Sequence, residues 1–500
     1  MNVCQDLCRL IGYAKENKLI EAEDEYVIRN QLMEAMKLSD WEESGAAYCG
    51  ESIDELLEAL ISDACESGII SDTAASRDLF DTKLMGILTR LPHEVNREFF
   101  DRYKNESPVS ATDWYYDYSK KLNYVRAGRI ARDRKWVYES EYGALDLTIN
   151  CSKPEKDPRD IAAAGAAKAS AYPKCQLCPE NAGFAGHMSH PARQNLRPIS
   201  MEIQGGKWQF QYSPYGYYNE HCIVFNEQHI PMKIDEPVFE KLFDLIDILP
   251  HYFVGSNADL PIVGGSILSH EHFQGGNYTF AMAKAAVETP IPLGGFPEVS
   301  AGIVKWPMSV IRLQCADRKK LVKACAMILS RWRAYSDPQA GIFSETDGIP
   351  HNTITPIARK AGERYECDLV LRNNITSEER PLGIFHPNPT LHHIKKENIG
   401  LIEVMGLAVL PARLRTEMEK LAQVLVREGV PAVRRDPELE KHADWAEEFS
   451  ARNTLTEENV REVIRMEIGR VFEQVLADAG VYKRDESGRT AFLRFTDTLK

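Results

Sequence analysis

Two histidines and a glutamine alternate in a short segment that ends in a pair of glycines. The segment reads Ser269-His-Glu-His-Phe-Gln-Gly-Gly276. On an extended strand the side chains of His270, His272 and Gln274 would point to the same face, because strand side chains alternate with a period of two. A polar strand face exposed to solvent would give the same pattern, so the spacing by itself leaves both readings open.

The residue types in this segment suit phosphoryl chemistry. A neutral imidazole, with a reference pKa of about 6.5, is a competent nucleophile near pH 7. It can attack a phosphorus atom and form a phosphoramidate that a second substrate displaces. The amide of Gln274 could donate to the phosphoryl oxygens as charge builds on them, and the glycines would let backbone approach a phosphate.

A CxxC motif, Cys175-Gln-Leu-Cys178, is the second feature. It is compatible with two buried thiols, a redox pair or half of a zinc site. The redox interpretation needs a thioredoxin-like βαβ context, which the Ala-rich, Pro-flanked stretch before it does not supply. Zinc would need two more ligands, commonly histidines. Spacing alone does not choose among the candidates, which are His229, His270, His221, His187 and His190.

Two further segments are rich in basic and polar side chains. His190-Pro-Ala-Arg-Gln-Asn-Leu-Arg197 could hold a nucleotide phosphate or ribose through Arg193, Asn195 and Arg197, or it could be a solvated loop. The segment from His386 to Lys396 could bind a sugar phosphate or a metal, or be a surface loop.

The elements that must position these residues predict an α+β fold. The first hundred residues have helical patterning, including a capping box at Ser52–Glu55. Alternating residues on either side of Gly205-Gly206 predict a hairpin. We expect further strands at 222–225, from Pro261 to about Gln274 and at 367–372, a helix at 236–248, and two C-terminal helices, over about 414–425 and over about 460–475, the second with Gly480 as its C-cap.

Composition restricts the class of protein. The net charge of −14 disfavours a polynucleotide partner, because nucleic-acid binders carry a basic excess that displaces phosphate counterions. The apolar stretch from Ile399 to Pro411 is too short to cross a bilayer. We expect a cytoplasmic protein, since no secretory signal is visible and 11 scattered cysteines suit a reducing compartment.

In combination and order, these motifs resemble the galactose-1-phosphate uridylyltransferases of the type II, bacterial branch, within the histidine-triad superfamily. The resemblance covers most of the chain. It rests on the CxxC motif, the 190–197 segment, Tyr218-Asn-Glu-His-Cys-Ile-Val-Phe-Asn-Glu-Gln-His229, Gly264-Gly-Ser-Ile-Leu-Ser-His-Glu-His-Phe-Gln-Gly-Gly276 and His392-His-Ile-Lys-Lys-Glu-Asn-Ile-Gly-Leu-Ile-Glu403.

The resemblance implies a ping-pong exchange in which UDP-glucose donates its uridylyl group to a histidine and galactose 1-phosphate then accepts it. In the type I branch the nucleophile is the second His of a His-Pro-His-x-Gln motif, which matches His272, and the Gln matches Gln274. The type I zinc ligands carry over to Cys175, Cys178, His229 and His270. Substrate contacts are expected from Asn257, Ser266 and Ser269, in addition to the 190–197 residues.

The sequence departs from type I in three ways. Glu271 replaces the motif proline, the helical N-terminal region has no clear counterpart, and the second type I metal site has no unambiguous match. We therefore expect one structural zinc at most and no organic cofactor, since a four-ligand site leaves no open position for chemistry.

The expected organisation is a histidine-triad-like antiparallel strand core in two blocks with helical flanks. We assign residues 1–120 to a helical N-terminal region, 121–325 to a first transferase half and 326–500 to a second half ending in helices. The expected ligands are UDP-sugars and hexose 1-phosphates, with no nucleic acid and no membrane, and a homodimer is compatible. The rivals are a transferase or phosphorylase for ADP-sugars or dinucleoside polyphosphates, a non-catalytic zinc-stabilised binding protein, and a zinc hydrolase.

Overall fold

The computed structural model describes residues 3–43, 45–152, 171–265 and 267–500. The chain is α+β and divides into two compact units, the first comprising residues 1–132 and 152–230 and the second 133–151 and 231–500. These units group residues by spatial contact. They do not test the predicted division of the chain into regions 1–120, 121–325 and 326–500, which stays a prediction. No helix within the described residues is both long enough and apolar enough to cross a membrane.

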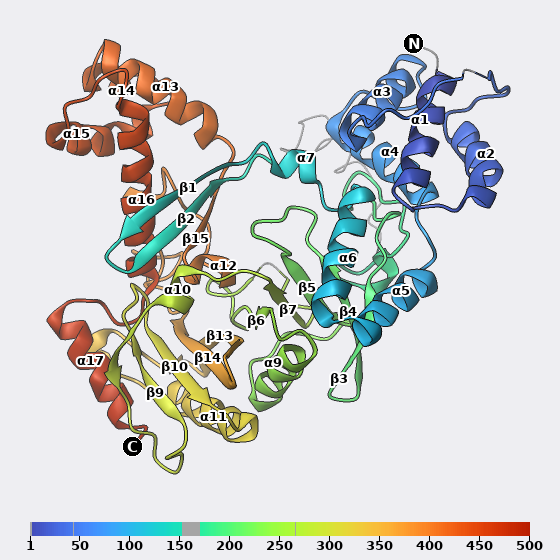
Figure 1. The fold of residues 1–500 in the computed structure, drawn as a ribbon. Coiled ribbons are helices and arrows are strands. Elements are labelled where there is room, and N and C mark those ends of the chain that lie inside the picture. The colour runs from blue at the N-terminus through green and yellow to red at the C-terminus, as the bar shows by residue number, and fades with distance from the viewer. Residues whose placement is uncertain (1–2, 44, 153–170, 266) are drawn as a thin grey trace. The chain divides into compact units, whose positions relative to one another are not determined.

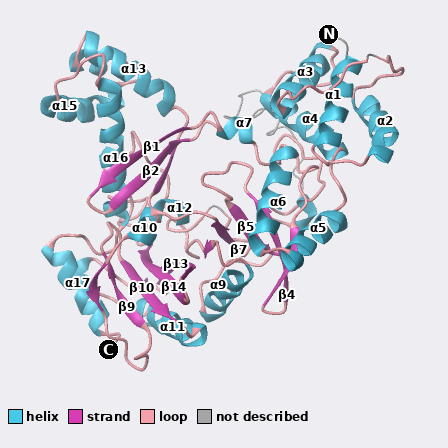
Figure 2. Cartoon of the chain, in the orientation of Figure 1, coloured by secondary structure: helices cyan, strands magenta, loops and turns pink. Residues whose placement is uncertain are grey.

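The first unit begins with helices, as the patterning predicts (Figures 1 and 2). The capping box is present, because the Ser52 side chain accepts from the backbone of Glu55 and the Glu55 side chain accepts from the backbone of Ser52. The helical elements are α1 (Val3–Glu16), η1 (Ala22–Asp24), α2 (Glu25–Ala35), α3 (Ile53–Glu66), α4 (Ala74–Ile87), α5 (Pro92–Asn105), α6 (Pro108–Lys121), α7 (Ala127–Ile130) and η2 (Pro179–Asn181).

Three strands of the first unit form an antiparallel meander, β3 (Ile199–Ile203), β4 (Gly206–Tyr212) and β5 (Cys222–Asn226). The predicted hairpin is confirmed, and Gln204 and Gly205 make its turn with positive φ. An aromatic core joins this meander to α5 and α6, because the rings of Phe99 and Tyr115 contact Phe210. Tyr115 also donates to the carbonyl of Arg197 at 2.8 Å, which ties the 190–197 segment to α6.

The second unit holds an antiparallel sheet whose strands run in the order β7-β6-β13-β14-β10-β9-β8. Helices α9 and α11 pack together and against β13. The predicted helix at 236–248 and strand at 367–372 are confirmed within α9 and β14. The bounds are β6 (Phe253–Gly255), β7 (His272–Gly276), β8 (Val287–Pro290), β9 (Ser300–Val304), β10 (Val310–Cys315), β13 (Asn352–Ala361), β14 (Arg364–Asn373), α9 (Glu236–Ile248) and α11 (Arg318–Arg333).

A smaller sheet of the second unit has the order β1-β2-β15, with β1 and β2 antiparallel and β15 parallel to β2. Helix α16 packs on β1, and α13 packs on α16. The bounds are β1 (Arg134–Ser140), β2 (Gly143–Ile149), β15 (Leu407–Leu410), α10 (Ala281–Lys284), α12 (Leu401–Val404), α13 (Leu414–Arg427), α14 (Val430–Arg435), α15 (Ala443–Arg452), α16 (Val460–Ala479) and α17 (Glu486–Asp497).

Short elements complete the second unit, namely β11 (Glu345–Thr346), β12 (Ile349–Pro350), η3 (Pro338–Ala340), η4 (Pro389–Leu391) and η5 (Glu440–His442). Gly480 is the C-cap of α16, as expected, although its φ of −70° is not left-handed. A Cβ at this glycine would lie 3.0 Å from the carbonyl oxygen of Pro307, so close packing is what favours glycine there.

The predicted strand from Pro261 to about Gln274 is wrong over most of its length. Turns and irregular backbone occupy the described part of 261–271, and the strand β7 begins only at His272. Ile262 has a φ of +74°, and a Cβ on Gly264 would lie 2.4 Å from the carbonyl oxygen of Ala258. The glycine therefore permits a tight turn where the pattern predicts extended chain.

Candidate active site and metal centre

His272 is the first residue of β7 and is buried, with only 5% of its surface exposed. Its Nδ1 lies 2.7 Å from the carbonyl oxygen of His270. A carbonyl only accepts, so Nδ1 carries the proton and Nε2 keeps its lone pair. Burial is the main cause that lowers the pKa of His272 below its usual value, which favours the neutral ring. The local geometry thus provides a neutral imidazole with one nucleophilic nitrogen.

Gln274 lies two residues further along β7, so its side chain leaves the strand on the same face as that of His272. It pairs with Gly255 of β6 and is half-buried. His270 lies in the turn that precedes β7, which corrects the expectation that all three side chains share one strand face. That face is built from His272 and Gln274.

Glu271 points away from this pair and meets helix α9. Its carboxylate is buried and forms an ion pair with Lys241 of α9, with Nζ 2.5 Å from Oε1. The carboxylate has only a minor influence on the pKa of His272, in which burial dominates. Glu271 therefore attaches the start of β7 to α9.

Lys241 could not be recognised from the sequence, because it lies 30 residues before Glu271 and has the spacing of an ordinary helix-surface residue.

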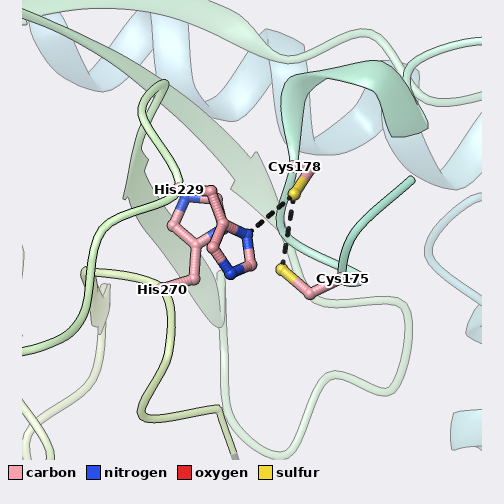
Figure 3. Close-up of side chains that lie close together, drawn as sticks. All are labelled: Cys175, Cys178, His229 and His270. Carbon is pink, nitrogen blue, oxygen red and sulfur yellow. Dashed lines mark hydrogen bonds between the residues drawn. The ribbon is translucent and has the colours of Figure 1, made fainter. Parts of the chain in front are cut away.

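Four potential metal ligands come together, and Figure 3 shows the two thiols and two imidazoles facing one another. Ligand atoms of Cys175, Cys178, His229 and His270 all lie within 4.8 Å of one another. The sulfurs are 3.6 Å apart, and Cys178 Sγ is 3.2 Å from His229 Nδ1. This is the combination that the family resemblance implies. Within the described residues no other group of three or more His, Cys, Asp or Glu side chains is arranged to hold a metal ion.

The donor set fits a metal ion. Burial raises the pKa of the Cys178 thiol to about 11, so without an ion it would be protonated at neutral pH. A bound cation reverses that preference, because it favours thiolate over thiol. Two sulfurs and two imidazole nitrogens form the usual tetrahedral set of a structural zinc site.

The CxxC loop is shaped by an asparagine that the sequence reasoning missed. Asn181 is buried, and its Nδ2 donates to the carbonyls of Cys175 and Cys178, at 2.8 Å each. Its Oδ1 lies 2.7 Å from Nε2 of His190. His190, a candidate ligand on spacing, thus supports the loop. A signal was available, since Asn181 lies three residues after Cys178, but an asparagine two residues after a proline is also typical of an ordinary turn.

Two models of known protein families match this chain. Residues 18–231 match the model of the galactose-1-phosphate uridyl transferase N-terminal domain, and residues 245–447 match that of the C-terminal domain. The chain belongs to the galactose-1-phosphate uridyl transferase family.

Relatives are similar over the full length. The galactose-1-phosphate uridylyltransferase of Halalkalibacterium halodurans is 51% identical, over 98% of this chain and 97% of the relative. That of Clostridium acetobutylicum is 50% identical over 99% of each, and that of Bacillus subtilis 48% identical over 100% and 98%. Among solved structures, yeast Ap4A phosphorylase Apa2 matches at 10% identity and a TM-score of 0.34, over 70% of this chain and 96% of that one.

In this member of the uridyl transferase family, polar side chains of the 190–197 segment form hydrogen bonds with backbone carbonyls of the protein. Asn195 is buried and donates to the carbonyl of Leu122 at 2.9 Å. Arg197 donates to the carbonyls of Arg90, Gln194 and Leu196, and burial lowers its pKa. Arg193 is half-buried, with its guanidinium 5.8 Å from the ring centre of Tyr124. These contacts have structural roles, and the predicted ligand-binding roles stay predictions.

The remaining predicted contacts lie in the second unit. Asn257 is buried, and its Oδ1 accepts from the backbone of Leu401 at 3.0 Å. Ser269 is exposed in the turn before β7. Ser266 lies outside the described residues. The substrate-contact roles of these three side chains stay predictions.

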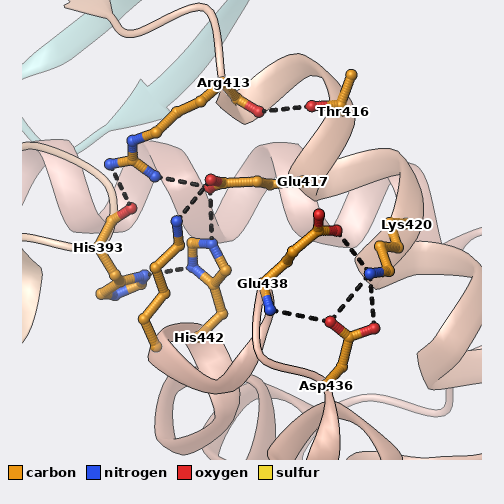
Figure 4. Close-up of polar contacts among 9 residues, drawn as sticks. His393, Arg413, Thr416, Glu417, Lys420, Asp436, Glu438 and His442 are labelled. Carbon is orange, nitrogen blue, oxygen red and sulfur yellow. Dashed lines mark hydrogen bonds and ion pairs between the residues drawn. The ribbon is translucent and has the colours of Figure 1, made fainter.

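The histidines of the 386–396 segment make hydrogen bonds within the second unit. His393 Nδ1 lies 2.8 Å from His442 Nδ1, and His442 Nε2 lies 3.0 Å from Glu417 Oε2 (Figure 4). Arg413 contacts the first and last residues of this hydrogen-bonded series, since it donates to the carbonyl of His393 at 3.0 Å and to Glu417 at 2.6 Å. His386 and His392 lie close to backbone carbonyls of Lys396 and Pro387. The histidines of this segment therefore stabilise local structure.

Proposed function

We propose that this member of the family transfers UMP from UDP-glucose to galactose 1-phosphate, giving UDP-galactose and glucose 1-phosphate, with His272 as the covalent nucleophile. The observation that carries the proposal is the hydrogen bond from Nδ1 of His272 to the carbonyl of His270. It leaves Nε2 as the only nitrogen of that ring with a lone pair to give.

In the first half-reaction, Nε2 attacks the phosphorus that bears uridine. The bond from that phosphorus to the bridging oxygen breaks, and glucose 1-phosphate leaves with the electron pair. The ring becomes positively charged, and the carbonyl of His270, which already accepts from Nδ1–H, stabilises that charge. The amide of Gln274, on the same face of β7, donates to the oxygens of the phosphoryl group.

The second half-reaction reverses these roles. A phosphate oxygen of galactose 1-phosphate attacks the same phosphorus, the N–P bond breaks, and the lone pair returns to Nε2. One nucleophile serves both halves, because each half makes and breaks one bond to the same phosphorus. Since burial already favours the neutral ring, no separate base is needed to restart the cycle.

We assign zinc to Cys175, Cys178, His229 and His270, as a structural ion. The ion would hold the imidazole of His270, whose carbonyl fixes the His272 tautomer. Outer contacts of this kind commonly orient reactive groups. The zinc is assigned no chemical step, because four protein ligands leave no open coordination position. This also disfavours the zinc hydrolase, which would need a metal-bound water.

The same function predicts a setting for the protein. Sugar phosphates and UDP-sugars are intracellular metabolites, so we place the enzyme in the cytoplasm. A homodimer is proposed as its assembly, which light scattering on the purified full-length chain would test.

The direct test is the intact mass of the protein after incubation with UDP-glucose and no acceptor. We expect an adduct of one uridylyl group, absent in His272→Asn and removed by galactose 1-phosphate as UDP-galactose forms. His93→Asn is a matched control, because His93 is exposed on α5 and should leave the adduct intact.

A folded, zinc-containing wild type that forms no adduct would contradict the mechanism. An adduct from ADP-glucose in place of UDP-glucose would indicate the adenine-specific alternative, and ligand binding without any turnover would indicate a non-catalytic binding protein.

A further inference from the structure

A cavity of about 320 Å³ opens in the second unit, among β1, β2, α13 and α16. Figure 1 shows the β1–β2 hairpin running alongside α16. None of the residues that line the cavity belongs to the candidate active site or metal centre. The side chains at its floor are buried and aliphatic or thioether in character, namely Ile149, Leu414, Met418, Ile464 and Ile468.

The rim of this cavity is strongly basic. Five lining side chains are cationic, Arg134, Lys135, Arg415, Arg461 and Arg465, against a single acidic one, Glu419. The chain as a whole carries a net charge of −14, so the rim reverses the general charge of the protein. Such a local reversal around a concave surface attracts anions.

Two of the five cations form ion pairs with neighbouring glutamates. Arg461 pairs with Glu419 at 2.5 Å, and Arg465 pairs with Glu462 at 3.4 Å. Arg134 also lies near Glu419, whose pKa is lowered mainly by Arg461 and in part by Arg134. Arg134 and Arg415 are exposed, so they can reach a ligand at the mouth of the cavity, whereas Lys135 leaves β1 on the opposite face from Arg134.

One wall is an indole ring that is held in place. Trp136 is half-buried, and its Nε1 donates to the carbonyl of Arg465 on α16 at 3.2 Å. It lies two residues from Arg134 on β1, so the two side chains leave the strand on the same face. A flat ring and a guanidinium thus stand side by side above an apolar floor.

We propose that this cavity binds a nucleotide at a site separate from the one where uridylyl transfer occurs. The base would lie against Trp136 and the apolar floor, and the phosphate would bind Arg134 and Arg415. Base–aromatic stacking and phosphate–arginine pairing are the contacts that nucleotides make most readily. Inorganic phosphate would leave the floor uncovered, and an uncharged ring would leave the cations unpaired. The volume is at the lower end of the range for small-ligand pockets.

The test is photolabelling of the full-length protein with 8-azido-AMP. We expect saturable labelling that maps to peptides containing Trp136, residues 414–419 or residues 461–468. AMP should compete at least tenfold better than either adenosine or inorganic phosphate, because only AMP carries both the ring and the phosphate.

Matched variants locate the site. The double variant Arg134→Glu, Arg415→Glu should weaken AMP binding at least tenfold in equilibrium dialysis. Arg435→Glu makes the same kind of charge change on an exposed residue of α14 outside the cavity, and should bind like the wild type. All three substitutions fall on exposed side chains, and circular dichroism would confirm that the variants fold. Trp136→Leu should reduce the preference for AMP over inorganic phosphate.

Three results would overturn the proposal. One is labelling confined to peptides that contain His272 or Cys175, which would place the nucleotide in the active site. Another is wild-type affinity in the double variant. The third is the absence of saturable labelling at millimolar probe. The first does not bear on the uridylyl–histidine mechanism, whose own test is the mass adduct.

Discussion

Two histidine clusters of this protein differ in what surrounds the imidazoles. Around Cys175, Cys178, His229 and His270, the partners are thiols and other imidazoles, and the ligand atoms converge within 4.8 Å. Around His393 and His442, the partners are Glu417 and the cations Arg413 and Lys441, which satisfy the rings in a closed chain of hydrogen bonds. The first arrangement suits a cation, whereas the second already contains its own countercharges.

The direction of proton donation shows the same contrast. Glu417 accepts from Nε2 of His442, so Nδ1 of His442 is left to accept from Nδ1–H of His393. In that cluster, the ring N–H groups of both histidines donate to other members of the cluster. Beside the first cluster, His272 gives its only proton to a carbonyl and keeps a nitrogen for chemistry. Histidine content alone therefore says little about reactivity, and the partner of each nitrogen decides it.

The largest effect is expected from removing the reactive ring. His272→Asn should lower kcat by about 10⁴-fold or more, since loss of a covalent nucleophile typically has an effect of that size. The purified variant should keep its zinc content and its melting temperature within a few degrees. Coupled assay of UDP-galactose formation measures the rate, and a residual rate within tenfold of the wild type would remove His272 from the mechanism.

Breaking the thiol cluster should affect metal and stability together. Cys178→Ala should reduce bound zinc to near zero by mass spectrometry and destabilise the fold by about 3–5 kcal/mol, because structural zinc binding contributes directly to folding free energy. Cys315→Ala removes a buried thiol outside the metal group and should leave zinc unchanged. Equal zinc content in the two variants would rule out the assigned site.

Breaking the second cluster should affect stability alone. Glu417 is 13% exposed and pairs with Arg413, Lys441 and His442. Glu417→Gln should destabilise the fold by about 2–3 kcal/mol, because it leaves partly buried cations without their countercharge. Zinc content and the uridylyl adduct should not change. Glu438→Gln, at a 72% exposed partner of Lys420, should have an effect of at most about 0.5 kcal/mol in the same urea titration.

The smallest effect is a change in pH dependence. Burial lowers the pKa of His393 to about 3 and that of His442 to about 4. Between these values and about 6.5, the unfolded chain binds protons that the folded chain does not, so stability falls as the pH is lowered through that window. His393→Asn should reduce the slope by about 1 kcal/mol per pH unit between pH 6 and 4.5. Parallel curves for variant and wild type would mean that His393 is protonated in the fold.

Much of this protein follows from the sequence because the relevant signals are local. The capping box, the hairpin about Gly205 and the α9 helix need only neighbouring residues. The candidate pair His272 and Gln274 was also predicted from local sequence, since a period of two puts both side chains on one face. The strand at 261–271 was mispredicted, because β-branched residues beside glycines suit a strand and a tight turn equally well, and only close contact with Ala258 decides between them.

The residue types in the sequence determined that this chain could hold a metal and carry a nucleophilic histidine. Spacing alone left open which histidines join Cys175 and Cys178, and the family resemblance named His229 and His270. These histidines lie 51 to 95 residues from the cysteines, so the four ligands meet only through folding. Tertiary structure alone decided that His190, Asn195, Arg197 and His393 have structural contacts, since buried polar groups must find partners wherever packing places them. Likewise, the basic cavity beside Trp136 combines three separate stretches of sequence, none of which has a distinctive pattern by itself.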